Sequence, residues 1–483
     1  MTRKFSQRQI IFWLGFVILA GLPLASWGQD LTIPALLVSD IHFDPFHDPA
    51  KVPQLVKAPV SQWVAILSAA PSPDQAKAYM ALQQTCHVRG VDTPYALLSS
   101  SLQAMSSRQP DAKFITVSGD LLAHAFSCRF GALVPGATPS DRQGFVLKTL
   151  SFVMGELRAR FPGLPIYVAL GNNDSPCDDY RFDAGGDFLA QSARLVAEGL
   201  PVSQRQLVIK EFATGGYYSV TMGASLPKTR LIVVNDVFLS PRYSTCAGKP
   251  DPVAATAEMA WLQEELVEAR RMGQSVWVMG HIPPGVDPYS TVAKFRDVCG
   301  SQGPEMFLAS DRMTDLLIEY ADIIRLGIFA HSHMDELRLL ASPGGGEHGV
   351  AIKMVPSISP VDGNNPSFMV AHVDRPSAGL QNYQVIAASN QTGIATTWST
   401  EYDYAQTYHE AQFSPQAVKR LIKGFESDRE AKTEASQAYI RNYYVGDLSP
   451  ELQPFWPLYI CALAHPTAKG FAACECGKAV VGR

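Results

Sequence analysis

The sequence has little excess charge of either sign. It contains 40 Lys and Arg against 45 Asp and Glu, which gives a formal net charge of −5 on 483 residues. So small an imbalance gives no indication of a surface that binds a nucleic-acid polymer. Internal repeats and low-complexity tracts are missing, and hydrophobic residues make up 47% of the chain. This composition excludes disordered and fibrous proteins and is typical of a globular chain with one large domain or several domains.

Long apolar runs are absent after the first few dozen residues. At the N-terminus, a basic start precedes an apolar stretch over residues 10–24 and a small-x-small site at 26–28. The stretch is shorter than the ~20 residues that a membrane span needs. The pattern therefore predicts a signal peptide over residues 1–28, with an uncleaved anchor as the alternative. We expect a secreted or periplasmic protein that begins near Gln29 and has no stable membrane span.

Paired cysteines with the spacing of a zinc ribbon are absent as well. The eight cysteines are even in number, and in an exported chain this favours disulfides over thiol chemistry. Cys461 is predicted to bond either Cys474 or Cys476 and so to fix the C-terminal tail. The other pairings stay open.

What the sequence does contain is a set of polar side chains, each placed just after an apolar run. In an open α/β fold, the carboxyl ends of the strands carry the chemistry. Each case is weak alone, because a Gly-Asp after a strand is more often a turn. Together the side chains supply eight contacts to two metal ions if Asp120 serves both. The residues are Asp40 and His42 after residues 35–39, Asp120 after 114–119, Asn172 after 166–171, His281 after 275–280, and His331 and His333 after 323–330.

The pattern between these runs predicts an α/β fold. Strands and helices alternate in the first part, and short strands with few helices between them predict a second sheet in the middle. Residues 43–91 are predicted to form an insertion beside the site. His47 and His87, which lie in it, are expected not to be metal ligands. Residues 29–398 are expected to form the catalytic domain, and 399–483 a helical region packed on it. The predicted helices cover 93–107 (capped by Asp92 or Thr93), 140–161 (capped by Ser140), 252–271, 400–409, 415–427 and 430–443, and the predicted middle strands cover 208–210, 216–222 and 229–234.

In this order, the motifs resemble the calcineurin-like metallophosphoesterase family. They are Asp40-x-His42, Gly119-Asp120-x3-His124, Gly171-Asn172, Gly280-His281 and His331-x-His333. Within that family, the acid sphingomyelinase-like phosphodiesterases are similar around residues 280–285, 331–336, 356–366 and 398–402. The resemblance covers most of the chain from Leu36 to about Tyr408.

The resemblance implies a sandwich of two mixed β-sheets flanked by helices, and a metal-dependent phosphoric ester hydrolase. One metal ion would be held by Asp40, His42, Asp120 and His333, and the other by Asp120, Asn172, His281 and His331. The donors are N and O atoms without a thiolate, which suits zinc and does not exclude iron or manganese. The nucleophile would be a hydroxide that bridges the two ions and attacks phosphorus.

One position departs from the family. The family usually reads Gly-Asn-His before Asp or Glu, and that histidine is thought to protonate the leaving oxygen. Here the position is Asn173, whose amide cannot donate a proton to an alkoxide. His124 matches the histidine that the subfamily places after Gly-Asp, and it is the candidate for the acid. The alternative is a histidine that only steers the phosphate.

The substrate expected from this resemblance is a small soluble phosphodiester. Sphingomyelinases proper carry a saposin-like module before the catalytic domain, whereas the first ligand strand here follows the predicted cleavage site closely. We therefore expect nucleotide-derived or choline-containing diesters. The alternatives are a sphingomyelin or phospholipid diesterase, a phosphomonoesterase, and a metal-bound binding protein with little activity. The sequence does not indicate an oligomeric state.

Overall fold

The computed structural model describes residue 2 and residues 31–300, 302–342, 349–446 and 452–477. The predicted signal peptide lies outside the described residues. From Thr32 to Arg483 the chain forms one compact unit. Of the helices in the described part, none combines the length and the apolar character needed to cross a bilayer.

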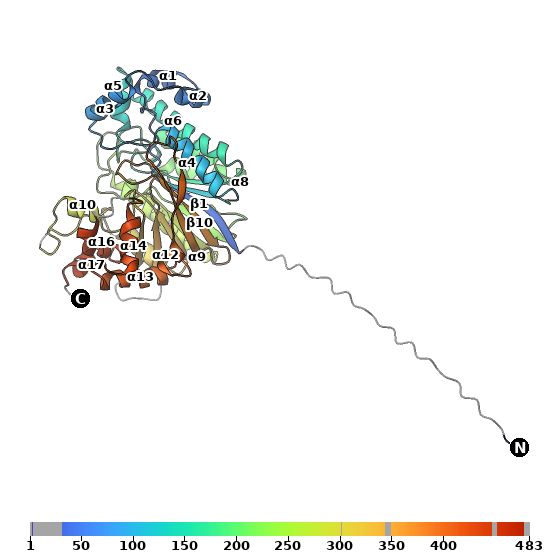
Figure 1. The fold of residues 1–483 in the computed structure, drawn as a ribbon. Coiled ribbons are helices and arrows are strands. Elements are labelled where there is room, and N and C mark those ends of the chain that lie inside the picture. The colour runs from blue at the N-terminus through green and yellow to red at the C-terminus, as the bar shows by residue number, and fades with distance from the viewer. Residues whose placement is uncertain (1, 3–30, 301, 343–348, 447–451, 478–483) are drawn as a thin grey trace. The chain divides into compact units, whose positions relative to one another are not determined.

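Two six-stranded mixed sheets form the centre of this unit (Figure 1). In the first sheet β1, β2 and β3 run parallel, and in the second β5, β6, β7 and β9 do. The first sheet has the order β12(Trp398–Asp403), β11(Leu380–Ala388), β10(Ser367–Asp374), β1(Thr32–Val38), β2(Ile115–Ser118), β3(Ile166–Ala169). The second has the order β4(Tyr218–Thr221), β5(Thr229–Val233), β6(Ser275–Met279), β7(Ile324–Phe329), β9(Gly349–Met354), β8(Glu336–Ala341).

The two sheets pack face to face, and helices cover their outer faces. Between the sheets, the Phe114 ring meets the indole of Trp277 edge-on, with centroids 5.7 Å apart. Helices α4, α6, α7 and α8 pack in a row, with α4 on β10, while α9 lies on β5 and β6 and α13 lies on β8 and β9 (Figure 1). Buried apolar residues on both faces explain why most strands read as short apolar runs.

The helices have the following bounds: α1(Val52–Lys57), α2(Trp63–Ser68), α3(Gln75–Thr85), α4(Tyr95–Arg108), α5(Phe126–Leu133), α6(Pro139–Arg160), α7(Asp187–Glu198), α8(Val202–Gly215), α9(Pro252–Arg271), α10(Pro288–Ala293), α11(Arg312–Glu319), α12(Tyr404–Tyr408), α13(Pro415–Ser427), α14(Glu434–Tyr443), α16(Trp456–Ala464) and α17(Ala468–Glu475). The predicted α/β class, two mixed sheets and flanking helices are confirmed.

Two element predictions were wrong, and both errors have a physical reason. Residues 208–210 lie inside α8, where Val208 and Phe212 are buried one turn apart. A three-residue apolar run cannot distinguish a strand from one turn of helix. Residues 398–403 are the edge strand β12 rather than the start of a helix, so the expected domain boundary at 398/399 falls inside a strand.

Two of the predicted helix caps also differ. The Thr138 hydroxyl, not that of Ser140, accepts the N–H of Asp141 and begins α6. Pro94 stands at the start of α4 without a side-chain cap bond, because the Asp92 carboxylate is engaged elsewhere.

All eight cysteines form disulfides. The pairs are Cys86–Cys128, Cys177–Cys246, Cys299–Cys476 and Cys461–Cys474. The predicted bond from Cys461 to one of the two tail cysteines is confirmed. Disulfides of this number are typical of proteins from oxidising compartments.

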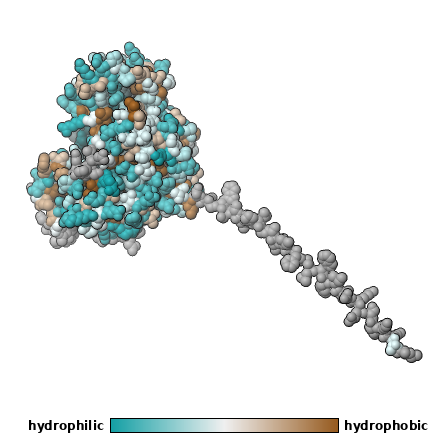
Figure 2. All heavy atoms as spheres, viewed as in Figure 1, coloured by the Kyte–Doolittle hydropathy of each residue, from teal (hydrophilic) through white to brown (hydrophobic). Residues whose placement is uncertain are grey.

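The outer surface is mixed in character. On the face seen in Figure 2, hydrophobic residues are scattered among hydrophilic ones. Scattered apolar residues are normal on soluble proteins, so this face gives no sign of a large apolar contact area.

Candidate metal centre

The seven predicted ligand residues lie together where strands of both sheets end. Asp40 and His42 follow β1, Asp120 follows β2 and Asn172 follows β3. From the second sheet, His281 follows β6, and the pair at 331 and 333 follows β7. Parallel strands end at the same edge of a sheet, which is why residues distant in the sequence meet here.

Five of the seven have left-handed backbones, which is unusual for residues other than glycine. The left-handed region costs an L-residue roughly 1–2 kcal/mol. Strain of this kind persists only where the surroundings enforce it, and it clusters at functional sites. The φ angles are 43° at Asp40, 41° at His42, 54° at Asp120, 74° at His331 and 65° at His333.

Glycines beside the ligand residues allow the loops to approach closely. A Cβ on Gly171 would lie 2.1 Å from Oδ1 of Asp120. A Cβ on Gly119, whose φ is +92°, would lie 2.8 Å from Nδ1 of His281. The glycines of the Gly-Asp and Gly-Asn motifs are therefore required by the packing of the site.

Asp40, His42 and His333 form what we name the inner half of the site. Nε2 of His42 lies 3.1 Å from Nε2 of His333, and Nε2 of His333 lies 3.4 Å from Oδ1 of Asp40. The other ring nitrogens are held by acceptors. Nδ1 of His42 donates to the Leu122 carbonyl at 2.9 Å, and Nδ1 of His333 lies 3.0 Å from the Asp362 carboxylate.

Asn172, His281 and His331 form the outer half. Nε2 of His281 lies 3.1 Å from Oδ1 of Asn172 and 3.3 Å from Nδ1 of His331. Nδ1 of His281 donates to the Ser118 carbonyl at 2.8 Å, which leaves Nε2 as an acceptor. Oδ2 of Asp120 reaches both halves, at 3.4 Å from Nε2 of His42 and 3.2 Å from Nε2 of His281.

Both halves thus bring acceptor atoms to face one another. A carbonyl can only accept, so His42 and His281 each carry a proton on Nδ1, and their neutral rings present a lone pair on Nε2. Oδ1 of the fully buried Asp40 has no hydrogen-bond partner. Facing lone pairs in a buried site repel unless a cation lies between them. The donor set, with Asp120 shared, therefore fits two divalent cations. Histidines that bind a metal usually donate their second ring N–H to a nearby oxygen, as His42 and His281 do here.

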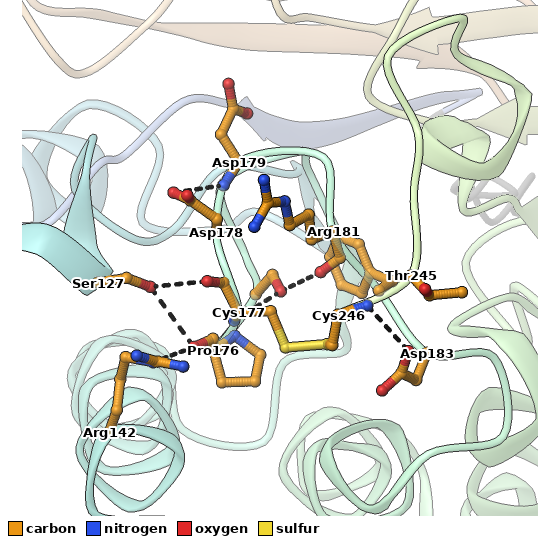
Figure 3. Close-up of a disulfide and its surroundings, with 12 residues drawn as sticks. Ser127, Arg142, Pro176, Cys177, Asp178, Asp179, Arg181, Asp183, Thr245 and Cys246 are labelled. Carbon is orange, nitrogen blue, oxygen red and sulfur yellow. Dashed lines mark hydrogen bonds between the residues drawn. A yellow bond between two sulfur atoms is a disulfide. The ribbon is translucent and has the colours of Figure 1, made fainter. Parts of the chain in front are cut away.

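One loop supports the outer half. Nδ2 of Asn172 donates to Oδ1 of Asp179 at 2.7 Å, and the Tyr180 hydroxyl lies 3.1 Å from Nε2 of His331. Arg242 pairs with Oδ2 of Asp179 at 2.9 Å and covers the Tyr180 ring at 4.0 Å. The disulfide Cys177–Cys246 joins this loop to the segment that carries Arg242 (Figure 3).

His124 lies beside the inner half and is tied to a buried charged network. Its ring stacks on that of His42 with centroids 4.0 Å apart, and it offers an atom within 4.8 Å of the ligand atoms of His42 and His333. Nδ1 of His124 lies 2.9 Å from Asp92. Arg129 is fully buried and bridges Asp92 and Asp44, at 3.3 and 2.8 Å.

This network sets the charge state of its members. Burial alone would raise the pKa of Asp92, but His124 and Arg129 outweigh it and hold that pKa well below its usual range. Burial disfavours the imidazolium of His124, but Asp92 outweighs it and raises the His124 pKa above its ordinary value. The side chain of His124 is 32% exposed while that of Asp92 is fully buried. A protonated imidazole can therefore face the site.

Asn173 binds the shared carboxylate. Its backbone N–H donates to Oδ1 of Asp120 and its side-chain amide donates to Oδ2, both at 2.8 Å. Asp174 accepts the N–H groups of Gly171, Leu121 and Leu122 and so fixes the loop. Burial and the neighbouring Asp120 raise the pKa of Asp174 to about 7.

Several functional candidates were missed from the sequence. Asp92 was expected as a helix cap, and Asp179, Tyr180, Arg242 and Asp362 were not singled out. None of them follows an apolar run directly, and each reaches the site from a loop, so no local pattern indicated a role in the site. His47 and His87, expected not to be ligands, are not among the groups within reach of a shared metal ion in the described residues.

The comparisons with known proteins point in one direction. No family model matches the chain. The acid sphingomyelinase-like phosphodiesterase 3b of Mus musculus is 24% identical over 483 residues, covering 96% of this chain and 93% of the relative. The cyclic GMP-AMP phosphodiesterase SMPDL3A of Mus musculus is 24% identical over 79% of this chain and 81% of its own length. The sphingomyelinase phosphodiesterase C of Dictyostelium discoideum is 24% identical over 79% and 82%.

Among solved structures, a dimetal phosphatase from Danio rerio is similar with a TM-score of 0.39 and 12% identity, covering 77% of this chain and 99% of that one. The resemblance to the metallophosphoesterase motifs is supported by the curated relatives, which match most of the chain. Over most of its length the chain is therefore similar to the acid sphingomyelinase-like phosphodiesterases.

Proposed function

We propose that this chain is a metal-dependent phosphodiesterase that hydrolyses small soluble phosphodiesters, with nucleotide-derived compounds as the preferred class. The observation that carries the proposal is the pair of facing clusters of imidazole, amide and carboxylate groups joined by Asp120, which fits two cations. The relatives named as phosphodiesterases support the reaction class, and the one named for cyclic GMP-AMP supports a nucleotide substrate.

In this proposal, one cation is held by the inner half with Asp120, and the other by the outer half with Asp120. Imidazole, carboxylate and amide donors without a thiolate suit zinc, and iron or manganese would be accepted by the same set. Two divalent cations in such a site supply Lewis-acid activation of a water molecule and neutralise charge that develops on the phosphoryl oxygens.

The protein's own contribution is orientation and a proton. Asn173 fixes both oxygens of Asp120 in place. His124, held through Nδ1 by Asp92, donates the proton of its other ring nitrogen to the leaving oxygen as the bond from phosphorus to that oxygen breaks. Asp92 stabilises the imidazolium before the transfer, so His124 acts as the general acid in place of the histidine that Asn173 replaces.

Hydrolysis of sphingomyelin or another phospholipid is the second candidate. It is favoured by the relative from Dictyostelium discoideum that is named as a sphingomyelinase phosphodiesterase.

A substrate panel tests the proposal. Metal-loaded protein should hydrolyse bis(p-nitrophenyl) phosphate faster than p-nitrophenyl phosphate, and a chelator should abolish both rates. Preference for the monoester would identify a phosphomonoesterase. No turnover of either would favour a metal-bound binding protein. Nucleotide diesters and sphingomyelin in the same panel separate the first candidate from the second.

We also propose that the protein is exported and that its predicted signal peptide is cleaved after Gly28. The four disulfides support an oxidising compartment. Mass spectrometry of secreted material should give a mature N-terminus at Gln29 and no free thiols. An intact Met1 with eight free thiols would contradict the proposal.

A further inference from the structure

One loop supplies a predicted ligand residue to each half of the metal centre. His331 belongs to the outer half and His333 to the inner half, and both lie between β7 and β8. Their backbones are left-handed, with φ angles of 74° and 65°. Such a conformation persists only where the neighbouring structure enforces it. Whatever holds this loop therefore acts on both halves at once.

The loop ends in a buried cluster of charged and polar side chains. Asp335, two residues after His333, pairs with the ammonium of Lys353 on β9. Lys353 also donates to the carbonyl of Glu336 at 3.1 Å, and the Tyr402 hydroxyl donates to Oδ2 of Asp335 at 2.5 Å. We name Asp335, Lys353 and Tyr402 the loop anchor.

The loop anchor joins segments that are distant in the sequence. Lys353 lies in the second sheet, whereas Tyr402 comes from β12, the edge strand of the first sheet. The ammonium of Lys353 also lies 4.9 Å from the ring centroid of Tyr383 on β11. The backbone N–H of Asp335 donates to the carbonyl of Tyr443, the last residue of α14, at 2.9 Å. The C-terminal region is thus connected to the loop that carries His331 and His333 through Asp335.

Stability alone explains this ion pair poorly. The side chains of Lys353 and Asp335 are 1% and 2% exposed. Burial lowers the pKa of the Lys353 ammonium below its ordinary value, although Asp335 opposes the shift. Well-packed apolar residues often stabilise a protein as much as a buried ion pair does or more. The bonds of a pair are directional, however, so they fix one arrangement of the segments that they join.

We propose that the loop anchor is a positioning device that holds His331 and His333 toward the metal centre and thereby sets the affinity of both halves for their cations. Asp335, Lys353 and Tyr402 are positioning residues in this proposal, because they act through the loop and not by binding a cation or the substrate. The inference rests on the metal centre of the proposed function and is independent of the substrate class.

Metal affinity tests the loop anchor without a substrate. Lys353→Met keeps the length of the side chain and removes its charge, and Tyr402→Phe removes only a hydroxyl. In a competition between protein and chelator for zinc, Lys353→Met should weaken both cations by about 10–100-fold, the range for loss of a supporting contact. Tyr402→Phe should weaken both by a smaller factor. The visible absorption of cobalt(II)-loaded protein, which reports ligand geometry, should change in Lys353→Met.

A matched control separates position from stability. Arg230 pairs with Glu265 of α9 at 2.5 Å and lies near the start of β5, whereas the predicted ligand residues follow the ends of the parallel strands. Arg230→Met should lower the unfolding temperature of the metal-free protein. It should leave both zinc affinities and the cobalt spectrum unchanged.

A double variant removes both buried charges. Asp335→Val combined with Lys353→Met leaves no unpaired ion, so the metal-free protein should unfold at a higher temperature than Lys353→Met alone. Both cations should nevertheless stay weakened, because the bonds that fix the loop are gone. This combination of recovered stability and lost affinity distinguishes a positioning role from a purely structural one.

Three results would each overturn the inference. They are unchanged zinc affinities in Lys353→Met and Tyr402→Phe, weakening of one cation alone, and wild-type affinities in the double variant. If Lys353→Met does not fold, Tyr402→Phe and the double variant decide the question. A wild-type protein that binds two cations but hydrolyses no phosphodiester would instead overturn the proposed function and leave the loop anchor intact.

Discussion

The two halves of the metal centre are supported by different kinds of neighbour. In the inner half, His42 is held by the Leu122 carbonyl and His333 by Asp362, next to the buried charges of Asp92 and Arg129. In the outer half, Asn172 and His331 depend on Asp179 and Tyr180 of a single loop. The disulfide Cys177–Cys246 closes that loop (Figure 3), and Tyr180 of the loop lines a cavity of about 750 Å³.

Because their supporting contacts differ, the two halves of the metal centre can serve different tasks. The inner half lies beside His124, the proposed proton donor, while His331 of the outer half lines the cavity of about 750 Å³. Contacts that fix the tautomer and orientation of a ligand also tune its affinity for a metal ion. The two cations should therefore respond to different substitutions, and the expected effects below run from the largest to the smallest.

Asp120→Asn should have the largest effect. The substitution removes the negative charge that both halves share, so at least one cation should be lost. Activity should fall further than the ~10–100-fold that loss of a supporting contact costs. Elemental analysis and diester hydrolysis measure the two effects, with the exposed Asp111→Asn as the control. Two metals per chain and near-normal activity in the variant would contradict the assignment of Asp120.

His124→Ala should have an effect that depends on the leaving group. General acid catalysis is typically worth ~10²–10⁴-fold, and it is needed when the leaving group is a poor one such as an alkoxide. A loss of that order is expected on an alkyl diester, and little loss on an aryl diester, because nitrophenolate leaves without a proton near neutral pH. Both cations should remain bound. Equal losses on the two substrates would mean that His124 positions the phosphate instead.

Asp179→Ala and Asp362→Ala should separate the two halves directly. Each removes a contact to a ligand residue, one in the outer half and one in the inner half. Each should weaken one cation by about 10–100-fold and leave the other unchanged. Chelator competition on each variant measures both affinities, and thermal unfolding checks that the fold is kept. If both variants weaken the same cation, the division into halves is wrong.

The proposed ligand residues of both halves and the contacts that support them were not equally accessible from the sequence. That the seven proposed ligand residues lie together could be predicted because each follows a strand, and a strand of apolar residues is visible in a short window. The order of the motifs then indicated a resemblance to the calcineurin-like metallophosphoesterases. The alternation of strands and helices followed from the same periodicity, whereas the sandwich of two mixed sheets came from the resemblance and many of the helices were not predicted.

The supporting contacts could not be predicted, for a different physical reason. Asp92 meets His124 across 32 residues, and Asp179 meets Arg242 across 63. Such contacts depend on how loops fold in three dimensions, and no local pattern records them. Asp92 also shows that two contacts compete for one carboxylate. It is placed to cap a helix but binds the ring of His124 instead, and α4 begins without a side-chain cap. The left-handed backbones of the ligand residues are likewise a consequence of tertiary packing.

Asn173→His should have the smallest effect, and it decides which residue supplies the proton. In the natural chain, the Asn173 amide donates to Asp120, and a histidine there would have to give up or replace that one hydrogen bond. If His124 is the acid, an added imidazole duplicates a donor already in place. Turnover of an alkyl diester should then change less than about tenfold, which corresponds to about 1.4 kcal/mol. The same substitution in the His124→Ala background should recover part of the lost alkyl-diester activity and change the aryl-diester rate little. A rise of about 10²-fold in the single variant would show instead that the natural chain lacks its acid, and the proton assigned to His124 would have to come from elsewhere.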